Sequence, residues 1–243
     1  MASVDLSSLF SYYIYRNIPR SLLLRNKGTA IYFAGDSGAM IKWGPSFFLD
    51  AEFNKANCEQ YLSVLEQAGA PRYLYYPNDA WLAFIKNTFG DKLQDIYLRV
   101  YASDPAKDTE AIEIPDCILP VTREFIEKNL PGAELITDEL YSYTDMEDFY
   151  RNGFGLALVQ EGRVCGFCLS EYSVDNSHGI NIWVDEKYRR QGYARKMTDA
   201  FLAHCKEKNQ TAYWVCDHDN IPSNKLAVSS GLILKSSMHY FEL

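Results

Sequence analysis

The feature that most constrains this chain is a basic, glycine-containing stretch, VDEKYRRQGYARKM (residues 184–197), between an extended segment and a helical one. It concentrates five cations in a chain of formal net charge −8: Lys187, Arg189, Arg190, Arg195 and Lys196. The acidic balance argues against nucleic acid as a bulk partner, so the cluster is interpreted as a local anion site. The alternative is a solvated helix start, and the flanking segments decide between the two.

The patterns around this stretch follow a definite order. Alternating apolar residues predict strands over 153–160, 163–172 and 179–185, with a turn at Glu161-Gly162 and a loose polar connection, SVDNSH, after the second strand. Helical periodicity begins at Tyr193. A strand over 211–217, a helix over 220–231 with an Asn220 cap, and a final strand follow. Two further helices are expected over 122–132 and 145–153.

The first half of the chain also alternates between strand and helix patterns. Strands are predicted over 29–35, 38–44, 72–76 and 95–102, and helices over 55–69 and 78–90. The segment near 103–118 is charged and lacks apolar periodicity, which is typical of a boundary. We therefore expect an α/β region over 1–117 and a second domain over 118–243.

A strand, a tight glycine-containing loop and a helix start together make an anion cradle, because the first helical N–H groups lack internal partners. Gly192 removes a side chain where an anion must approach the backbone, and Ala194 is the next smallest choice. Arg189 and Arg190 supply bidentate donors for phosphate oxygens. Neither G-x-x-x-x-G-K-[ST] nor G-x-G-x-x-G occurs, which excludes two familiar phosphate loops.

Arg189-x-x-Gly192-x-Ala194 resembles the acyl-CoA loop, [Q/R]-x-x-G-x-[G/A], of the GNAT acetyltransferase superfamily. NIPSNKLAVSSGL (residues 220–232) looks like the second motif of that superfamily. YWVCDHDN, Ser223 and LAVSSGL resemble the GNAT subfamily that includes the zwittermicin A resistance acetyltransferase. The resemblance covers residues 118–243 and implies a mixed, mostly antiparallel sheet flanked by helices. The preceding α/β region is interpreted as a degenerate GNAT-like half.

The resemblance also implies roles for particular residues. Acetyl-CoA would be the co-substrate, with its pyrophosphate at the loop, its pantetheine on the strand end and its thioester near the last helix. The residues implied are Trp183, Val184, Arg189, Arg190, Gln191, Gly192, Tyr193, Ala194, Arg195, Asn220 and Ser223. A plain helix cap is an equal interpretation for Asn220, and core packing is the favoured one for the Trp183 and Trp214 rings.

The chemistry implied is direct attack of a neutral amine on the thioester, which needs a base for the ammonium proton. Glu171, at the end of an expected strand, and His178, entering the next one, are the best-placed candidates. Two positions depart from the family pattern. Ala227 stands where many relatives have a tyrosine acid, and Gly179 stands where they often have a carboxylate.

Three hypotheses follow: an N-acetyltransferase acting on a small-molecule amine, a non-catalytic acyl-CoA-binding module, and an anion-binding protein that does not bind CoA. The six cysteines form no zinc pattern, and in Cys165-x-x-Cys168 strand alternation places the two thiols on opposite faces. We expect no metal, nucleic-acid or membrane partner. The absence of a signal peptide or long apolar run favours a cytoplasmic protein, and a homodimer stays open.

Overall fold

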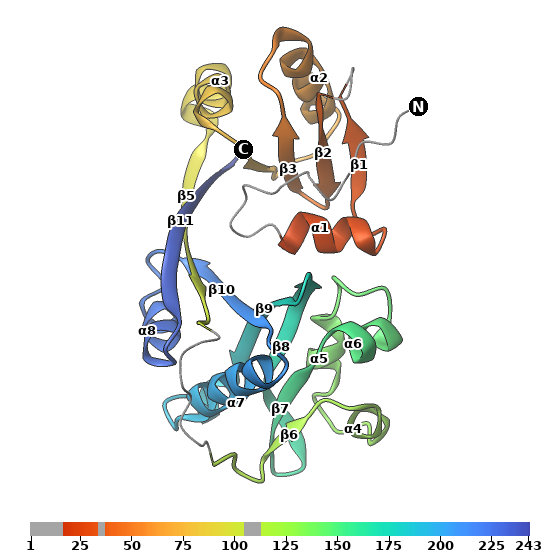
Figure 1. Ribbon diagram of the computed structural model, residues 1–243, viewed down its shortest axis with the longest axis vertical. Coiled ribbons are helices and arrows are strands. Elements are labelled where there is room, and N and C mark those ends of the chain that lie inside the picture. Colours follow the sequence, from red (N-terminus) through yellow and green to blue (C-terminus); the bar gives the residue numbers. More distant parts are fainter. Residues whose placement is uncertain (1–16, 34–36, 105–112) are drawn as a thin grey trace. The chain divides into compact units, whose positions relative to one another are not determined.

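The computed structural model describes residues 17–33, 37–104 and 113–243, and the chain forms two compact units. Unit 1 comprises Met1–Leu98 and Ser237–Leu243, and unit 2 comprises Arg99–Ser236 (Figure 1). The second part of the last strand, from Ser237, thus belongs to the first unit. This division is not the one expected from the sequence, because the described residues between 99 and 117 group with unit 2 and residues 237–243 group with unit 1. The extent of the family domain, 118–243, stays a prediction.

Unit 1 is a sheet with strand order β1-β2-β3-β4-β11. Strands β1, β2 and β3 are antiparallel, β4 is parallel to β3, and β11 is antiparallel to β4. Its elements are α1 (Asn17–Leu24), β1 (Thr29–Tyr32), β2 (Gly38–Trp43), β3 (Ser46–Ala51), α2 (Lys55–Glu66), β4 (Tyr73–Tyr75), α3 (Asp79–Phe89) and the 3₁₀ turn η2 (Gly90–Lys92). Strands β5 (Gln94–Ala102) and β11 (Ile233–Glu242) contribute residues to both units.

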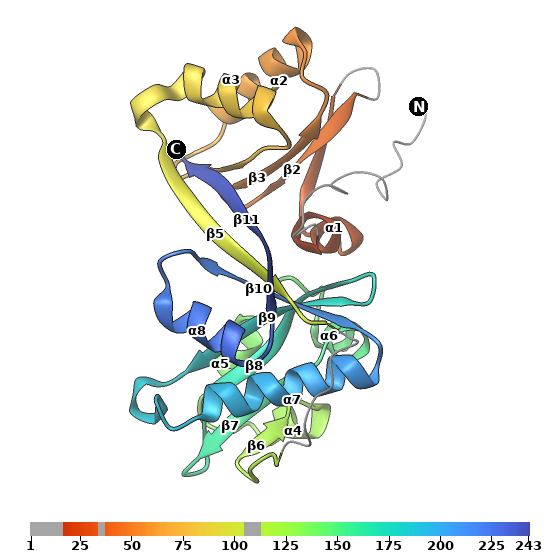
Figure 2. The same cartoon turned by 60° about the vertical axis from the view of Figure 1, so that its left-hand side comes forward.

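Both faces of the unit 1 sheet are covered, which explains why β2 and β3 are almost continuously apolar. Helices α2 and α3 lie on one face, where Tyr61 and Trp81 pack against Met40 (Figure 2). Helix α1 packs its Leu22 against Ile41 on the other face. Neighbouring residues of β2 therefore enter two different cores, as the alternation of a strand requires.

Unit 2 contains the order β5-β10-β9-β8-β7-β6, in which β6 to β9 are antiparallel and β10 is parallel to β9. Helix α7 covers one face, and three short helices cover the other (Figure 1). The elements are β6 (Ile118–Pro120), α4 (Arg123–Glu127), α5 (Glu134–Asp138), α6 (Met146–Asn152), β7 (Gly155–Gln160), β8 (Arg163–Val174), β9 (Ser177–Val184), η3 (Glu186–Tyr188), α7 (Tyr193–Glu207), β10 (Thr211–Asp217) and α8 (Ile221–Ser229).

The long helix α7 is held by its apolar face. Met197 and Phe201 are fully buried against the sheet, and burying a side chain of that size contributes about 1.5–3 kcal/mol. The helix therefore presents its first turn at the end of β9 in a fixed position, which matters for the site described below.

Two local features of β8 differ from the sequence-based expectations. A register shift lies opposite Leu158/Val159, and Cys165 and Cys168 both enter the α7-side core, whereas strand alternation predicted opposite faces. The SVDNSH connection is a tight hairpin and not a loose loop. Asp175 and Asn176 take φ values of 49° and 58°, the conformation of a two-residue type I′ turn. All six cysteines are free.

The two units repeat one order of elements. In unit 1 the meander β1-β2-β3 is followed by α2, then β4 parallel to β3, then α3 and β5. In unit 2 the meander β7-β8-β9 is followed by α7, then β10 parallel to β9, then α8 and β11. The repeat is one of topology, because the sequences of the two halves show no internal similarity.

Candidate functional site

Strands β9 and β10 of unit 2 pair only at their beginnings. Their ladder covers Ser177–Gly179 of β9, and beyond it the two parallel strands diverge. The divergence leaves a cleft of about 690 Å³, named here the β9–β10 cleft. Its lining comes from the end of β9, the following loop, the start of α7, and the region around the start of α8: Ile182, Trp183, Val184, Tyr188, Arg189, Arg190, Gly192, Tyr193, Ala194, Arg195, Trp214, Asn220, Pro222, Ser223 and Leu226.

Helix α7 begins in this cleft without a side-chain cap. Five other helices start with a side chain that accepts a hydrogen bond from a first-turn N–H: Asn54, Asn78, Thr122, Asp145 and Asn220. Helix α7 instead starts at Gly192, whose φ of 85° is in the left-handed region that favours glycine. The N–H groups of its first turn are thus left for an external acceptor, and the helix dipole favours an anion there.

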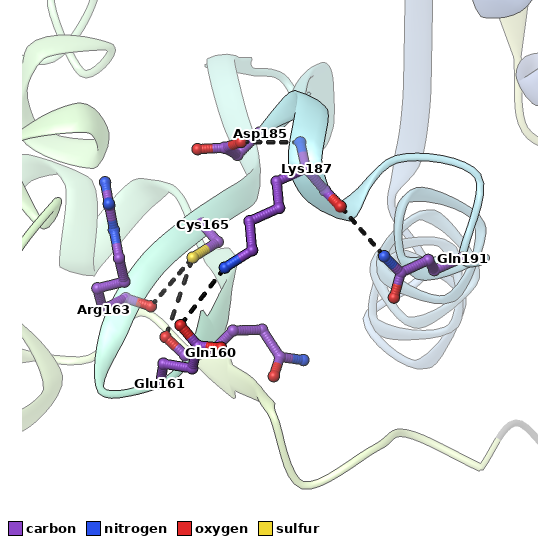
Figure 3. Close-up of polar contacts among 7 residues, drawn as sticks. All are labelled: Gln160, Glu161, Arg163, Cys165, Asp185, Lys187 and Gln191. Atoms are coloured by element: carbon purple, nitrogen blue, oxygen red, sulfur yellow. Dashed lines mark hydrogen bonds and ion pairs between the residues drawn. The ribbon is translucent and has the colours of Figure 1, made fainter.

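The basic loop, residues 185–192, is braced by its own contacts (Figure 3). The Asp185 carboxylate accepts from the Lys187 backbone N–H at 3.0 Å, and Gln191 Nε2 donates to the Lys187 carbonyl at 3.2 Å. Lys187 Nζ lies 3.5 Å from Glu161 in the β7–β8 turn. Lys187 and Gln191 therefore hold the shape of the loop, and neither lines the cleft.

The remaining cations of the loop divide into anchored and open ones. Arg189 Nε donates to the Val184 carbonyl at 2.8 Å, and Arg195 Nε lies 2.6 Å from the Asp199 carboxylate. Arg190 has φ 59° and an exposed side chain, with no ion pair to any described residue. Arg189 and Arg190 therefore remain the phosphate-binding candidates, with the guanidinium of Arg189 fixed at its Nε.

The end of β9 offers backbone groups to the cleft, but from different residues than expected. Asp185 N–H donates to the Cys165 carbonyl on β8 at 2.8 Å. In an antiparallel pair, only every second residue of a strand points its backbone N–H and C=O toward the neighbouring strand. The backbone of Trp183 therefore faces β8, while those of Ile182 and Val184 face the cleft. Of the two backbone contacts expected from the sequence, the geometry is compatible with Val184 and favours Ile182 over Trp183, and ligand pairing at this strand end stays a prediction. The Trp183 ring packs beside Phe167 at 5.9 Å.

The far wall of the cleft is the start of α8. Asn220 Oδ1 accepts from the Ser223 N–H at 3.2 Å, so the helix-cap interpretation of Asn220 is what the structure shows. Ser223 Oγ accepts from Trp214 Nε1 at 3.0 Å. Ala227 is fully buried in the core and offers no donor.

Asn224 fixes the loop that leads into α8. Its side chain is buried, and Nδ2 lies 3.0 Å from the Asp217 carbonyl and 2.8 Å from that of Asn220. Its Oδ1 accepts from the Tyr101 hydroxyl at 2.6 Å. The side chain thus ties β5 to the loop that carries Asn220.

We expect Asn224→Ala to lower the free energy of unfolding by about 3 kcal/mol, because it leaves buried carbonyls and the Tyr101 hydroxyl without a partner. Ser229→Ala, on the exposed face of the same helix, should cost about 0.5 kcal/mol or less. Urea unfolding of the two variants measures the difference. Equal stabilities would show that the loop is held without Asn224.

Glu171 lies in a bulge of β8. Ser170 pairs with Ile180 and Ser173 with His178, so Glu171 and Tyr172 both oppose Gly179. Gly179 has no side chain, and the neighbouring strand therefore supplies a carboxylate beside the position where relatives often carry one. The sequence alone gave no indication of this bulge.

The surroundings of Glu171 alter its acidity. Burial, the largest effect, raises the pKa of Glu171; hydrogen bonds from Tyr141 and Tyr172 lower it, and nearby Glu139 raises it, which together place the pKa at about 7. Glu139 itself accepts from Asn181 Nδ2 on β9 at 2.7 Å. Glu139, Tyr141 and Asn181 were not among the residues expected from the sequence, because they come from the α5–α6 connection and from the middle of β9.

His178 does not lie in the β9–β10 cleft. It is 2% exposed, its Nδ1 is 2.9 Å from Ser170 Oγ, and its ring meets the edge of Phe154 at 5.1 Å between centroids. Ser170 Oγ is also 2.7 Å from the Tyr143 hydroxyl. A histidine enclosed in this way belongs to the packing beside α7. Neither His178 nor Glu171 is among the residues that line the β9–β10 cleft, and the assignment of His178 as a base stays a prediction.

Unit 1 contains the corresponding parallel pair, β3 and β4, without the same site. Strand β4 pairs with β3 over Ser46–Phe48, and the β3–α2 connection is only Glu52-Phe53-Asn54, which has no glycine or cation. The indole of Trp81 donates to the Ala51 carbonyl at 2.8 Å, at the end of β3. A side chain of unit 1 itself therefore satisfies the strand end that in unit 2 faces a cleft.

A second cavity of unit 2, about 620 Å³, lies between α4, α6 and α7. Its charged residues have mixed signs, and Arg123 is paired with Glu147 at 2.5 Å. No cluster of three or more His, Cys, Asp or Glu suited to a metal occurs in the part of the chain that the structure describes. Within the same part, none of the helices has the length and apolarity needed to cross a bilayer.

Comparison with known proteins gives a consistent assignment. A family model described as GNAT acetyltransferase matches residues 17–240. The Bacillus subtilis (strain 168) protein named uncharacterized N-acetyltransferase YdfB is 22% identical over 219 residues, which cover 89% of this chain and 78% of that protein.

Two solved structures show the same fold. A GCN5-related N-acetyltransferase-like protein from Streptococcus suis 89/1591 is 23% identical, with a TM-score of 0.64 over 91% of this chain and 92% of that chain. A GCN5-related N-acetyltransferase from Kribbella flavida is 13% identical, with a TM-score of 0.59 over 97% and 96% of the two chains. Both align over most of their own length, which indicates that the likeness extends to both units.

Proposed function

This chain belongs to the GNAT acetyltransferase family, and from that premise we propose that it transfers an acetyl group from acetyl-CoA to the amine of a small molecule. Members of the family use an acyl-CoA donor. The observation that carries the proposal is the uncapped start of α7, which opens beside a diverging strand in one cleft. The expected GNAT-like fold, with a large, mostly antiparallel sheet and flanking helices, is confirmed.

The donor is proposed to occupy the β9–β10 cleft along its whole length. The pyrophosphate would accept from the N–H groups of Tyr193, Ala194 and Arg195, with Arg190 and the free end of the Arg189 guanidinium beside it. The pantetheine amides would pair with the outward backbone groups of β9 as an added strand would. The thioester would then lie near Asn220 and Ser223.

Glu171 is proposed as the base. A carboxyl whose pKa is about 7 is half ionised at neutral pH, so it can take the proton that an ammonium acceptor must lose. The amine lone pair then attacks the thioester carbonyl carbon, the C–N bond forms, and the C–S bond breaks with its electron pair on sulfur. The ammonium proton passes through Glu171 to solvent, and the nitrogen loses its second proton to solvent as the tetrahedral intermediate collapses to the amide.

The acceptor is proposed to be a small polar amine. The support is the resemblance of YWVCDHDN and LAVSSGL to the subfamily that includes the zwittermicin A resistance acetyltransferase. The repeated topology of the two units supports the interpretation of the N-terminal region as a degenerate GNAT-like half, and Trp81 at its strand end argues that this half holds no donor.

Calorimetry with CoA, followed by release of CoA from acetyl-CoA with a panel of amines, tests the proposal. Binding and turnover with at least one amine support it. Binding without turnover on a broad panel favours the alternative, a non-catalytic acyl-CoA-binding module. An absence of CoA binding would contradict both.

A further inference from the structure

The Ser223 hydroxyl has an unusual partner for a residue in the first turn of a helix. It accepts a hydrogen bond from the Trp214 indole N–H at 3.0 Å, and both residues line the β9–β10 cleft. The backbone N–H of Ser223 is already used by the Asn220 cap at 3.2 Å. Two contacts from β10 and from the helix cap thus fix the position of this side chain.

The Trp214 contact determines which part of the Ser223 hydroxyl stays available for a further hydrogen bond. An indole N–H can only donate, so the Trp214 contact occupies a lone pair of Ser223 Oγ and leaves the hydroxyl proton for another acceptor. The Cys216 thiol is a hydrogen-bond partner of both Ser223 and Trp214; burial raises the pKa of this thiol, and the two hydrogen bonds lower it. A neutral thiol is a weak acceptor, so a charged sulfur in the cleft would take the proton in preference.

On the face of helix α8 that borders the β9–β10 cleft, Ser223 supplies a hydroxyl donor. Ala227 lies one turn further along the same face and has no polar atom. Helical side chains lean toward the N-terminus, so a hydroxyl in the first turn of α8 extends past the helix end, where the cleft opens.

We infer that Ser223 donates a hydrogen bond to the sulfur that leaves as the C–S bond of the thioester breaks, and that Trp214 orients it. The inference rests on the proposed function. Ser223 keeps its proton throughout: sulfur departs with the bonding electron pair as a thiolate, the hydrogen bond stabilises that charge, and the thiolate takes its proton from solvent. A hydrogen bond to a charged acceptor is about twice as strong as a neutral one.

The test uses the product, CoA, and therefore needs no identified amine. The thiolate of CoA bound to the full-length protein is followed by its ultraviolet absorbance during a pH titration. In Ser223→Ala the thiolate fraction of bound CoA at pH 7 should fall about tenfold, the scale of one charge-assisted hydrogen bond. The affinity for desulfo-CoA, which lacks the sulfur, should not change.

The controls separate this role from a structural one. Ser229→Ala removes an exposed hydroxyl from the same helix and should behave as wild type. Trp214→Phe keeps a ring, removes the N–H, and should lower the thiolate fraction about threefold. An unchanged thiolate fraction in Ser223→Ala would overturn the inference while leaving the proposed function intact. An absence of CoA binding by the wild-type protein would overturn both.

Discussion

Gly192→Glu should weaken CoA binding at least a hundredfold while the chain keeps its fold. A Cβ added at this position would meet no atom within 4 Å, so the cost to the fold is the strain of a left-handed backbone conformation. It places a carboxylate at the uncapped start of α7, where the proposed pyrophosphate would accept from the N–H groups. The new charge both repels the phosphates and competes for their donors.

Gly162→Glu is the matched control for this variant. Gly162 has φ 75° and open space around its Cβ position, against φ 85° and open space at Gly192, but it lies in the β7–β8 turn away from the cleft. Both variants should lose about 1–2 kcal/mol of stability from the left-handed backbone. Calorimetry should show lost CoA affinity only in Gly192→Glu. If both variants bind CoA alike, the anion site lies elsewhere.

Much of the fold followed from local signals in the sequence. The strand Thr211–Asp217 and the helix Asp79–Phe89 were predicted to within a residue, and in the structure that helix is capped by Asn78 and ends at Gly90. In these segments the apolar period, the caps and the glycine stops agree with one another. Helix α1, strand β3 and helix α5 were missed, because short elements carry too few apolar repeats to show a period.

The candidate site could be predicted where it depends on consecutive residues. The charged and small residues of the segment Arg189–Arg195 follow one another in the sequence, so their pattern could be recognised there. The structure places most of them in the lining of one cleft. The contribution of Glu171 depends on a bulge, and Glu139 and Asn181 meet across elements far apart in the chain. A bulge changes which face a side chain takes, and strand alternation read from the sequence cannot reveal it. The same limit explains the error at Cys165 and Cys168.

Glu171→Gln should reduce turnover about a hundredfold or more with the affinity for CoA unchanged, the usual scale for loss of a general base. In the wild-type protein the rate should rise with pH and level off above about 7, because only the ionised carboxylate accepts the proton and its pKa is about 7. The rate of the Glu171→Gln variant should not show this rise with pH. Near-normal turnover with the same pH profile would remove Glu171 from the mechanism.

The same group makes a prediction about stability that needs no acceptor. Because the folded state holds the Glu171 proton more tightly than the unfolded chain, whose ordinary pKa is 4.5, this group stabilises the fold below pH 4.5, and that contribution is lost as pH rises through about 7. Glu171→Gln does not ionise, so its stability relative to wild type should increase between pH 4.5 and 8. Glu66→Gln, at an exposed position on α2, is the control for replacing a glutamate with glutamine. Thermal unfolding across this pH range measures both. A pH-independent difference for Glu171→Gln would mean that the carboxyl ionises normally in the folded protein, which would make its carboxylate too weak a base to take an ammonium proton efficiently.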